Sequence, residues 1–128
     1  MPRWVPGLPT VRSLSFADLT VLAVAENGDV WGWGRNNFGT VGDGTIADDG
    51  CAQACRWKPT KVRLATPTRL AIGATSVIAL TASDSIWLWG NNSSGQLGHK
   101  TGDAGDLLCG QGAAPEHCSP VPTRLAWP

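Results

Sequence analysis

The chain has 128 residues, and ten Lys and Arg residues balance ten Asp and Glu residues, so its formal net charge is zero. This length allows one domain with a modest core and is too short for a two-domain enzyme. Nucleic-acid-binding proteins usually carry a basic excess, so we expect no nucleic-acid partner. With 42% hydrophobic and 16% charged residues, the composition excludes a disordered chain. We expect no membrane span and no signal peptide, because no apolar run approaches roughly 20 residues and residues 1–7 lack an apolar segment.

Short strands and turns are predicted along the first half of the chain. After a segment at residues 11–16, a continuous apolar run at 21–25 has the length of a strand buried on both faces. Asn27-Gly28 then predicts a hairpin turn, because both residues tolerate a positive φ. A strand at 30–33 and another at 60–64 complete the set. No segment has a helical period, and 16 Gly with 9 Pro disfavour long helices.

The second half of the chain repeats the first. Residues 21–45 align with residues 77–101, an offset of 56 positions, and the two copies diverge into loops before they align again near Pro59 and Pro122. A second set of strands is therefore expected at residues 69–72, 77–80, 86–89 and 123–126. We interpret residues 1–128 as a single all-β domain, with repeat 1 at about 8–64 and repeat 2 at about 65–126.

Four short antiparallel strands in a unit of this size are typical of a β-propeller blade. A single blade exposes two apolar faces, and propellers close with about four to eight blades. The two blades would therefore belong to a longer chain, be completed by further copies in a ring, or form an open arc with exposed edges.

The repeats resemble a known family. Residues 86–98 read Ile-Trp-Leu-Trp-Gly-Asn-Asn-Ser-Ser-Gly-Gln-Leu-Gly, after Val-Ile-Ala-Leu-Thr at 77–81 and before Pro-Val-Pro-Thr-Arg-Leu at 120–125. This order resembles the repeat of the regulator of chromosome condensation (RCC1-like) family, over about residues 8–126. The resemblance implies two four-stranded antiparallel blades of a propeller that in this family is generally seven-bladed. Trp31 and Trp87 replace the family's usual Tyr, and the family's frequent His before the 77–81 strand is absent.

Positions that recur in both copies are expected to form the architecture of the repeat. They are Trp31, Trp33, Gly34, Asn36, Gly39 and Gly42 in the first copy, and Trp87, Trp89, Gly90, Asn92, Gly95 and Gly98 in the second. We expect the Trp side chains to pack between blades. The Asn side chains are expected to close the turn after the Trp strand, and the Gly residues to supply a positive φ. A light-sensing or sugar-stacking cluster is the alternative for the Trp residues.

Two cysteine pairs lie in equivalent loops: Cys51 with Cys55, and Cys109 with Cys118. The simplest interpretation is one disulfide in each loop, although four Cys allow three pairings. Disulfides indicate an oxidising compartment, so we expect an extracellular or cell-surface location. One alternative is a zinc site formed by all four Cys, with or without His117, although the spacings are not the tight C-x₂-C type. Reduced, unpaired thiols are the other alternative. We expect no metal and no cofactor.

Loop residues found in only one copy are the candidates for binding another protein. They are Phe38, Arg56, Trp57 and Lys58 in the first copy, and His99, Lys100, Glu116 and His117 in the second. Arg and Trp are enriched in binding hot spots, which favours Arg56 and Trp57. A loop folded on itself around Cys51 and Cys55 is the alternative interpretation.

No catalytic site can be defined from the spacing of His, Ser or acidic residues, so we expect no enzyme. The favoured function is a non-enzymatic propeller module that binds another protein. Members of the family differ widely in activity, so the resemblance carries the fold further than the function. One alternative is a guanine-nucleotide exchange factor or chromatin-associated regulator for a small GTPase, and another is a carbohydrate-binding propeller.

Overall fold

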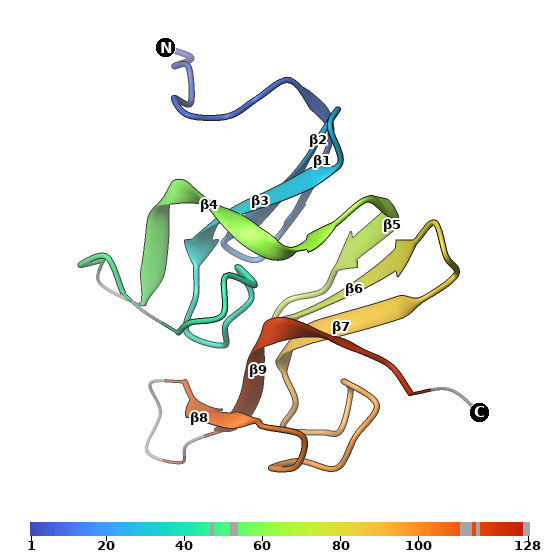
Figure 1. The fold of residues 1–128 in the computed structure, drawn as a ribbon. Coiled ribbons are helices and arrows are strands. Elements are labelled where there is room, and N and C mark those ends of the chain that lie inside the picture. Colours follow the sequence, from blue (N-terminus) through green and yellow to red (C-terminus); the bar gives the residue numbers. More distant parts are fainter. Residues whose placement is uncertain (47, 52–53, 111–113, 115, 127–128) are drawn as a thin grey trace.

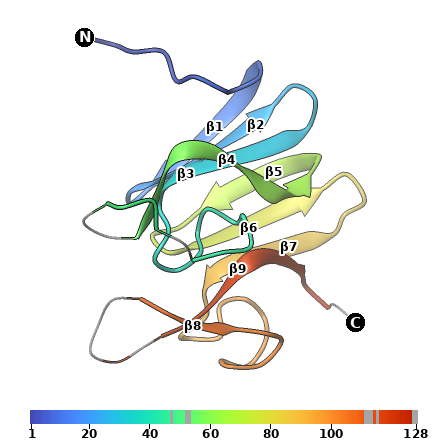
Figure 2. The same ribbon diagram turned by 60° about the vertical axis from the view of Figure 1, so that its left-hand side comes forward.

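The computed structural model describes residues 1–46, 48–51, 54–110, 114 and 116–126, and within them it contains nine strands and no helix. The strands form two antiparallel sheets that stack on each other (Figures 1 and 2). The first sheet has the order β1 (Val11–Ala17), β2 (Thr20–Ala25), β3 (Asp29–Arg35) and β4 (Cys55–Ala65). The second has the order β5 (Pro67–Ile72), β6 (Ser76–Thr81), β7 (Ile86–Asn91), β9 (Glu116–Arg124) and β8 (Leu107–Cys109). The all-β, two-blade architecture expected from the repeat is confirmed.

The β2–β3 hairpin forms where the sequence predicts it, with one difference in the turn. Gly28 has a φ of +90°, but Asn27 does not adopt a positive φ. Instead, the Asn27 side chain accepts a hydrogen bond from the backbone N–H of Asp29 at 3.0 Å. In the second sheet Asp84 occupies the same place as Gly28 and has a φ of +58°. Asp is one of the few residues that tolerate this conformation, so the second hairpin closes without Gly.

The outer strands differ from the sequence-based expectation. The fourth strand of the first sheet starts at Cys55, five residues before the predicted start, and β9 ends at Arg124 rather than at residue 126. β8 was not predicted, because three residues are too short to show an alternating pattern. It pairs with β9 through Leu107 and Cys118. Cys55, Cys109 and Cys118 therefore lie in strands, not in loops.

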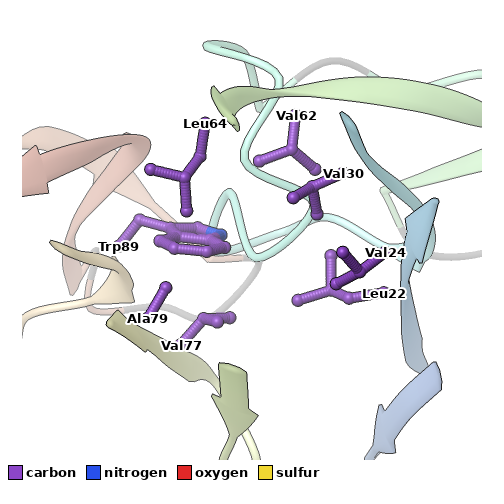
Figure 3. Close-up of a cluster of buried hydrophobic side chains, with 8 residues drawn as sticks. All are labelled: Leu22, Val24, Val30, Val62, Leu64, Val77, Ala79 and Trp89. Carbon is purple, nitrogen blue, oxygen red and sulfur yellow. The ribbon is translucent and has the colours of Figure 1, made fainter. Parts of the chain in front are cut away.

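The hydrophobic core lies between the two sheets. Figure 3 shows its eight buried side chains: Leu22, Val24, Val30, Val62 and Leu64 from the first sheet, and Val77, Ala79 and Trp89 from the second. Successive side chains of a strand point to opposite faces, so only every second residue of β2 and β3 joins this core. The large Trp89 ring fills the space between Leu64 and Ala79 (Figure 3) and is completely buried. Each sheet consequently covers one face of the other.

No helix in the described part of the chain has the length and apolarity that are needed to cross a membrane.

Candidate functional site

The segment after β3, residues 36–45, forms a compact turn that we call the Gly39 loop. The Asn36 side chain holds it together, because its Oδ1 accepts a hydrogen bond from Val41 N at 3.2 Å and its Nδ2 donates to Thr45 O at 3.1 Å. Gly39 and Gly42 have φ values of +69° and +80°, which L-residues with side chains rarely adopt. The loop is therefore a preformed shape, set by one buried Asn and two Gly.

Residues 92–101, which follow β7, form the same turn and are called the Gly95 loop. Asn92 Oδ1 accepts a hydrogen bond from Leu97 N at 3.1 Å, as Asn36 does from Val41. Gly95 and Gly98 have φ values of +72° and +82°, within a few degrees of their counterparts in the Gly39 loop. The two loops thus match at these two glycines, but they differ two residues later, where Gly44 has a φ of +92° and Lys100 does not adopt a positive φ.

The Gly39 loop packs on the second sheet. Trp89 Nε1 donates to Thr40 O at 2.9 Å, and Gly44 N donates to Pro120 O at 3.0 Å. A Cβ added to Gly42 would lie 2.7 Å from the Trp89 indole nitrogen, so this close approach excludes any larger residue. Thr40 Oγ1 also reaches Thr75 O, at 3.5 Å. The carbonyl and glycine backbone of the loop thus fit against one Trp and one Pro.

The corresponding surface of the first sheet is an open apolar groove of about 400 Å³, which we call the Trp57 groove. It is formed mainly by Leu19, Trp33, Arg35, Cys55, Arg56 and Trp57. The repeat offsets relate Trp33 to Trp89 and Trp57 to Pro120, and the strand register agrees, because Gly34 pairs with Arg56 as Gly90 pairs with Ser119. The Trp57 groove is therefore the first repeat's version of the surface that the Gly39 loop covers on the second.

Exposure differs between equivalent residues for this reason. Trp89 is completely buried, whereas Trp33 is only partly buried and Trp57 is 62% exposed. On the opposite face, Leu22 is 1% exposed beneath the second sheet, and its counterpart Ile78 is 45% exposed. The expected packing of the Trp residues between blades thus holds for Trp89, while Trp33 faces the open groove.

Arg56 is fixed at the edge of the groove. Its Nε donates to Asp43 at 2.9 Å, its Nη1 to Asp49 at 2.8 Å, and its Nη2 to Thr45 at 3.0 Å. Partial burial alone lowers the pKa of Arg56, but the hydrogen bond to Asp49 and the charges of both carboxylates outweigh it and raise the pKa above its ordinary value. The guanidinium therefore ties the Gly39 loop to β4 and has little freedom to meet a partner.

The other candidates of the first repeat lie on two sides of it. Lys58 is exposed, and its ammonium nitrogen lies 4.6 Å from the centroid of the exposed Trp57 ring. Phe38 is partly buried beside the second repeat, where its ring lies 3.4 Å from the position of a Cβ on Gly110. Gly110 N also donates to Asn37 O at 2.9 Å. Trp57 and Lys58 form one exposed pair, and Phe38 belongs to the contact between the repeats.

The candidates of the second repeat surround the Gly95 loop. His99 Nε2 lies 2.9 Å from Asp106, whose other oxygen accepts hydrogen bonds from Asn92 at 2.7 Å and from Gly102 N at 3.1 Å. Burial alone raises the pKa of Asp106, but these hydrogen bonds outweigh it and lower the pKa below its ordinary value. The Asp106 carboxylate therefore organises this loop.

Three further candidates lie near that carboxylate without forming one site with it. Glu116 accepts a hydrogen bond from the Asn91 side chain at 2.9 Å, and the His117 ring packs against Gly102. Lys100 is exposed on the Gly95 loop. The eight residues proposed from the sequence thus fall into separate groups, and only Arg56 and Trp57 line the groove.

Both expected disulfides form, Cys51 with Cys55 and Cys109 with Cys118. Among the described residues, one set of side chains has the spacing of metal ligands, Asp48 with Cys51 and Cys55. Both sulfurs of that set belong to the disulfide, which leaves a single carboxylate as a donor. This arrangement disfavours the zinc alternative, which needs free thiolates.

Sequence reasoning missed Leu19 and Arg35 as groove residues. Leu19 corresponds to Thr75 and Arg35 to Asn91, and neither pair is chemically alike. The 56-residue offset between the repeats relates these residues to Thr75 and Asn91. It could identify them as groove residues only once the contacts of the second repeat were known.

The family comparison agrees with this geometry. The regulator of chromosome condensation (RCC1) repeat matches residues 27–80, and a second description of the same repeat matches residues 11–40. The chain is 28% identical over 109 residues to the human E3 ubiquitin-protein ligase HERC2, covering 80% of this chain and 2% of that protein. It is 31% identical over 80 residues to the ultraviolet-B receptor UVR8 of Arabidopsis thaliana, covering 60% of this chain and 17% of the receptor. The chain therefore spans only a small part of these relatives.

Solved structures share the fold. Yeast RCC1 (Prp20), in its complex with Kap60, superposes with a TM-score of 0.72 at 20% identity, over 93% of this chain and 26% of that one. Human WBSCR16 superposes with a TM-score of 0.64 at 19% identity, over 98% of this chain and 29% of that one. The repeated loops, the two stacked sheets and the family matches lead to one conclusion: the chain belongs to the RCC1-like repeat family, and its sheets are two blades of that family's β-propeller.

Proposed function

We propose that the chain is a non-enzymatic protein-binding module and that it binds through the Trp57 groove. The observation that carries this proposal is the open apolar surface around Trp33 and Trp57, whose counterpart in the second repeat is covered by protein. An exposed Trp beside an immobilised Arg has the composition of a binding hot spot. Because Arg56 is already held by Asp43 and Asp49, a partner need not order it on binding.

Similarity to other propellers supports a protein as the ligand. Yeast RCC1 has been solved with Kap60, and Prp20p of Saccharomyces cerevisiae has been described together with its binding properties to Gsp1p and histones. The identity to both structures is 20–21%, so these partners are not transferred to this chain. The two disulfides support a place of action outside the reducing cytosol, at the cell surface or beyond it.

The experiment is a binding titration against defined ligands, namely core histones, a small GTPase, the chain itself and a glycan panel. We expect saturable binding to a protein that weakens at least tenfold in Trp57→Asp. Trp4→Asp is the matched control, because Trp4 is 90% exposed outside the groove. Circular dichroism checks the fold of each variant. Tryptophan fluorescence that shifts with glycans but with no protein would instead support the carbohydrate alternative and overturn the proposal.

Guanine-nucleotide exchange is the second candidate function, and the fold similarity to yeast RCC1 favours it. Release of labelled GDP from a small GTPase tests it directly. We expect no acceleration by this chain alone, because it covers 26% of that structure and offers two blades of surface. Catalytic acceleration that survives Trp57→Asp would replace protein binding through the groove with exchange activity through another surface.

A further inference from the structure

The Gly95 loop and the Trp57 groove correspond to the two sides of the contact between the repeats. Inside the molecule the Gly39 loop covers Trp89 and Pro120. At one end the Gly95 loop repeats the φ values of Gly39 and Gly42, and in the described part of the chain no hydrogen bond joins it to the other sheet. At the other end the Trp57 groove is open. We propose that the partner of the groove is a second copy of this chain, whose Gly95 loop docks into it head to tail. This inference rests on the proposed function and names its partner.

The groove offers the acceptors and donors that the internal contact uses. Trp33 takes the place of Trp89, so its Nε1 donates to Gln96 O of the second copy as Trp89 does to Thr40 O. The carbonyl of Trp57 takes the place of Pro120 O, which accepts from Gly44 N in the internal contact. The indole donor and the carbonyl acceptor of the internal contact therefore both have counterparts in the groove.

The carbonyl of Leu19 is a third group of the groove that has a counterpart in the internal contact. It already accepts a hydrogen bond from Arg35 N at 2.8 Å, as Thr75 O accepts one from Asn91 N at 2.8 Å. Thr75 O has a second hydrogen-bonding neighbour, the Thr40 hydroxyl of the internal contact. Leu19 O lacks that neighbour within the described chain, so it is placed to accept from a side chain of an incoming loop.

The loop offers the matching shape. Gly95 and Gly98 repeat the φ values of Gly39 and Gly42, which approach Pro120 and Trp89 too closely for any side chain. Gln96 and Lys100 are exposed, whereas Thr40 of the covered loop is 3% exposed. The two loops share their glycine turns and differ in exposure, as expected if the Gly95 loop docks on another molecule.

Residues that differ between the loops are compatible with docking. Gln96 replaces Thr40, and its amide can donate to Leu19 O where the Thr40 hydroxyl approaches Thr75 O. Trp57 replaces Pro120 and adds apolar surface to the contact. The zero net charge of the chain leaves no long-range repulsion between copies.

Such a contact is heterologous, because the loop of one copy meets the groove of the next. Repetition closes a ring if the rotation fits and otherwise extends a filament. Each copy adds two blades, so about two to four copies give the four to eight blades of a closed propeller.

The test is the mass in solution, measured by light scattering on a size-exclusion column without reducing agent. Two variants separate the two surfaces: Trp57→Asp in the groove and Gln96→Glu on the loop. Glu keeps an oxygen to accept from Ser94 N, as Gln96 does at 2.8 Å, but replaces the amide donor by a charge. We expect the wild type to exceed its monomer mass of 13.4 kDa and each variant to run as a monomer.

A mixture of the two variants tests whether the loop of one copy binds the groove of another. The loop of Trp57→Asp and the groove of Gln96→Glu are intact, so the mixture retains one working interface and should form a complex of twice 13.4 kDa. A wild-type monomer, or a dimer that persists in Gln96→Glu because grooves meet each other, would overturn the inference. If the wild type stays monomeric but another protein binds and Trp57→Asp abolishes it, the proposed function survives. If Trp57→Asp changes neither the binding of another protein nor the mass in solution, the proposed function and the head-to-tail association are both wrong.

Discussion

The two tryptophans of equivalent position, Trp89 and Trp33, allow the energy of the contact between blades to be measured within one chain. We consider the substitution of each by Phe, made in the Gln96→Glu background so that association between copies does not contribute. Trp89 is completely buried and donates to Thr40 O at 2.9 Å, whereas Trp33 borders the open groove. The two substitutions remove the same atoms from different surroundings.

The expected cost follows from those surroundings. At position 89 the lost donor leaves the buried Thr40 carbonyl without that hydrogen bond, which costs about 1–3 kcal/mol. The smaller ring also leaves a cavity between Leu64 and Ala79, which adds about 1–2 kcal/mol. Trp89→Phe should therefore lower the free energy of unfolding by about 3 kcal/mol. Trp33→Phe should lower it by less than about 1 kcal/mol, as is usual for a partly exposed site.

Urea denaturation followed by far-UV circular dichroism measures both values. A domain of this size has a total stability of about 5–15 kcal/mol, so a loss of 3 kcal/mol displaces the midpoint clearly. Equal losses of unfolding free energy at the two positions would contradict this prediction, because they would mean that stacking of the sheets does not determine how much each Trp side chain stabilises the fold.

Three further predictions concern the disulfide of the second repeat and the carboxylates of Asp106 and Asp43. Replacing Cys109 and Cys118 together by Ser should lower the free energy of unfolding by about 2–3 kcal/mol in urea denaturation, and no change would show that the bridge leaves the unfolded chain unconstrained. Because the folded state lowers the pKa of Asp106 from its ordinary value of 3.8, its stabilisation is present above that value and is lost as pH falls through the folded pKa. Stability measured from about pH 6 to pH 3 should therefore fall less steeply in Asp106→Asn, and an unchanged slope would contradict this. Arg56→Met should cost about 2 kcal/mol, because it leaves the buried carboxylate of Asp43 without its ion pair. Arg56→Met combined with Asp43→Asn should recover part of that loss, and no recovery would argue against the pair.

Much of the fold was predictable because the two halves of the sequence repeat the same pattern of apolar runs and turn residues. Apolar runs at residues 21–25 and 77–80, each followed by a turn and a Trp-x-Trp strand, indicate hairpins whatever their surroundings. The equivalent positions of the two Cys pairs likewise predicted disulfides that the structure contains. Strand β8 could not be predicted, because its three residues pair only where β9 and a disulfide hold them.

The candidate site was predictable only in part. Trp57 stood out as a residue present in one copy alone, and it is exposed on the groove. Arg56 stood out for the same reason, but two carboxylates from the neighbouring loop hold it. Residue type does not distinguish these cases, because Asp43 in the Gly39 loop and Asp49 beyond it are brought to Arg56 only by the folded structure.

The sequence indicates the repeat, four strands in each blade, the glycine turns of the Gly39 and Gly95 loops and the resemblance to the family. These are local properties, set by the spacing of apolar residues, turn residues and glycines within about fifty positions. Which member of each repeated pair is covered depends on contacts between distant parts of the chain. Trp33 and Trp89 have nearly the same local sequence, yet a blade packs on one and not on the other. Burial depends on which neighbour lies across the sheet, and that neighbour is distant in the chain or belongs to another molecule.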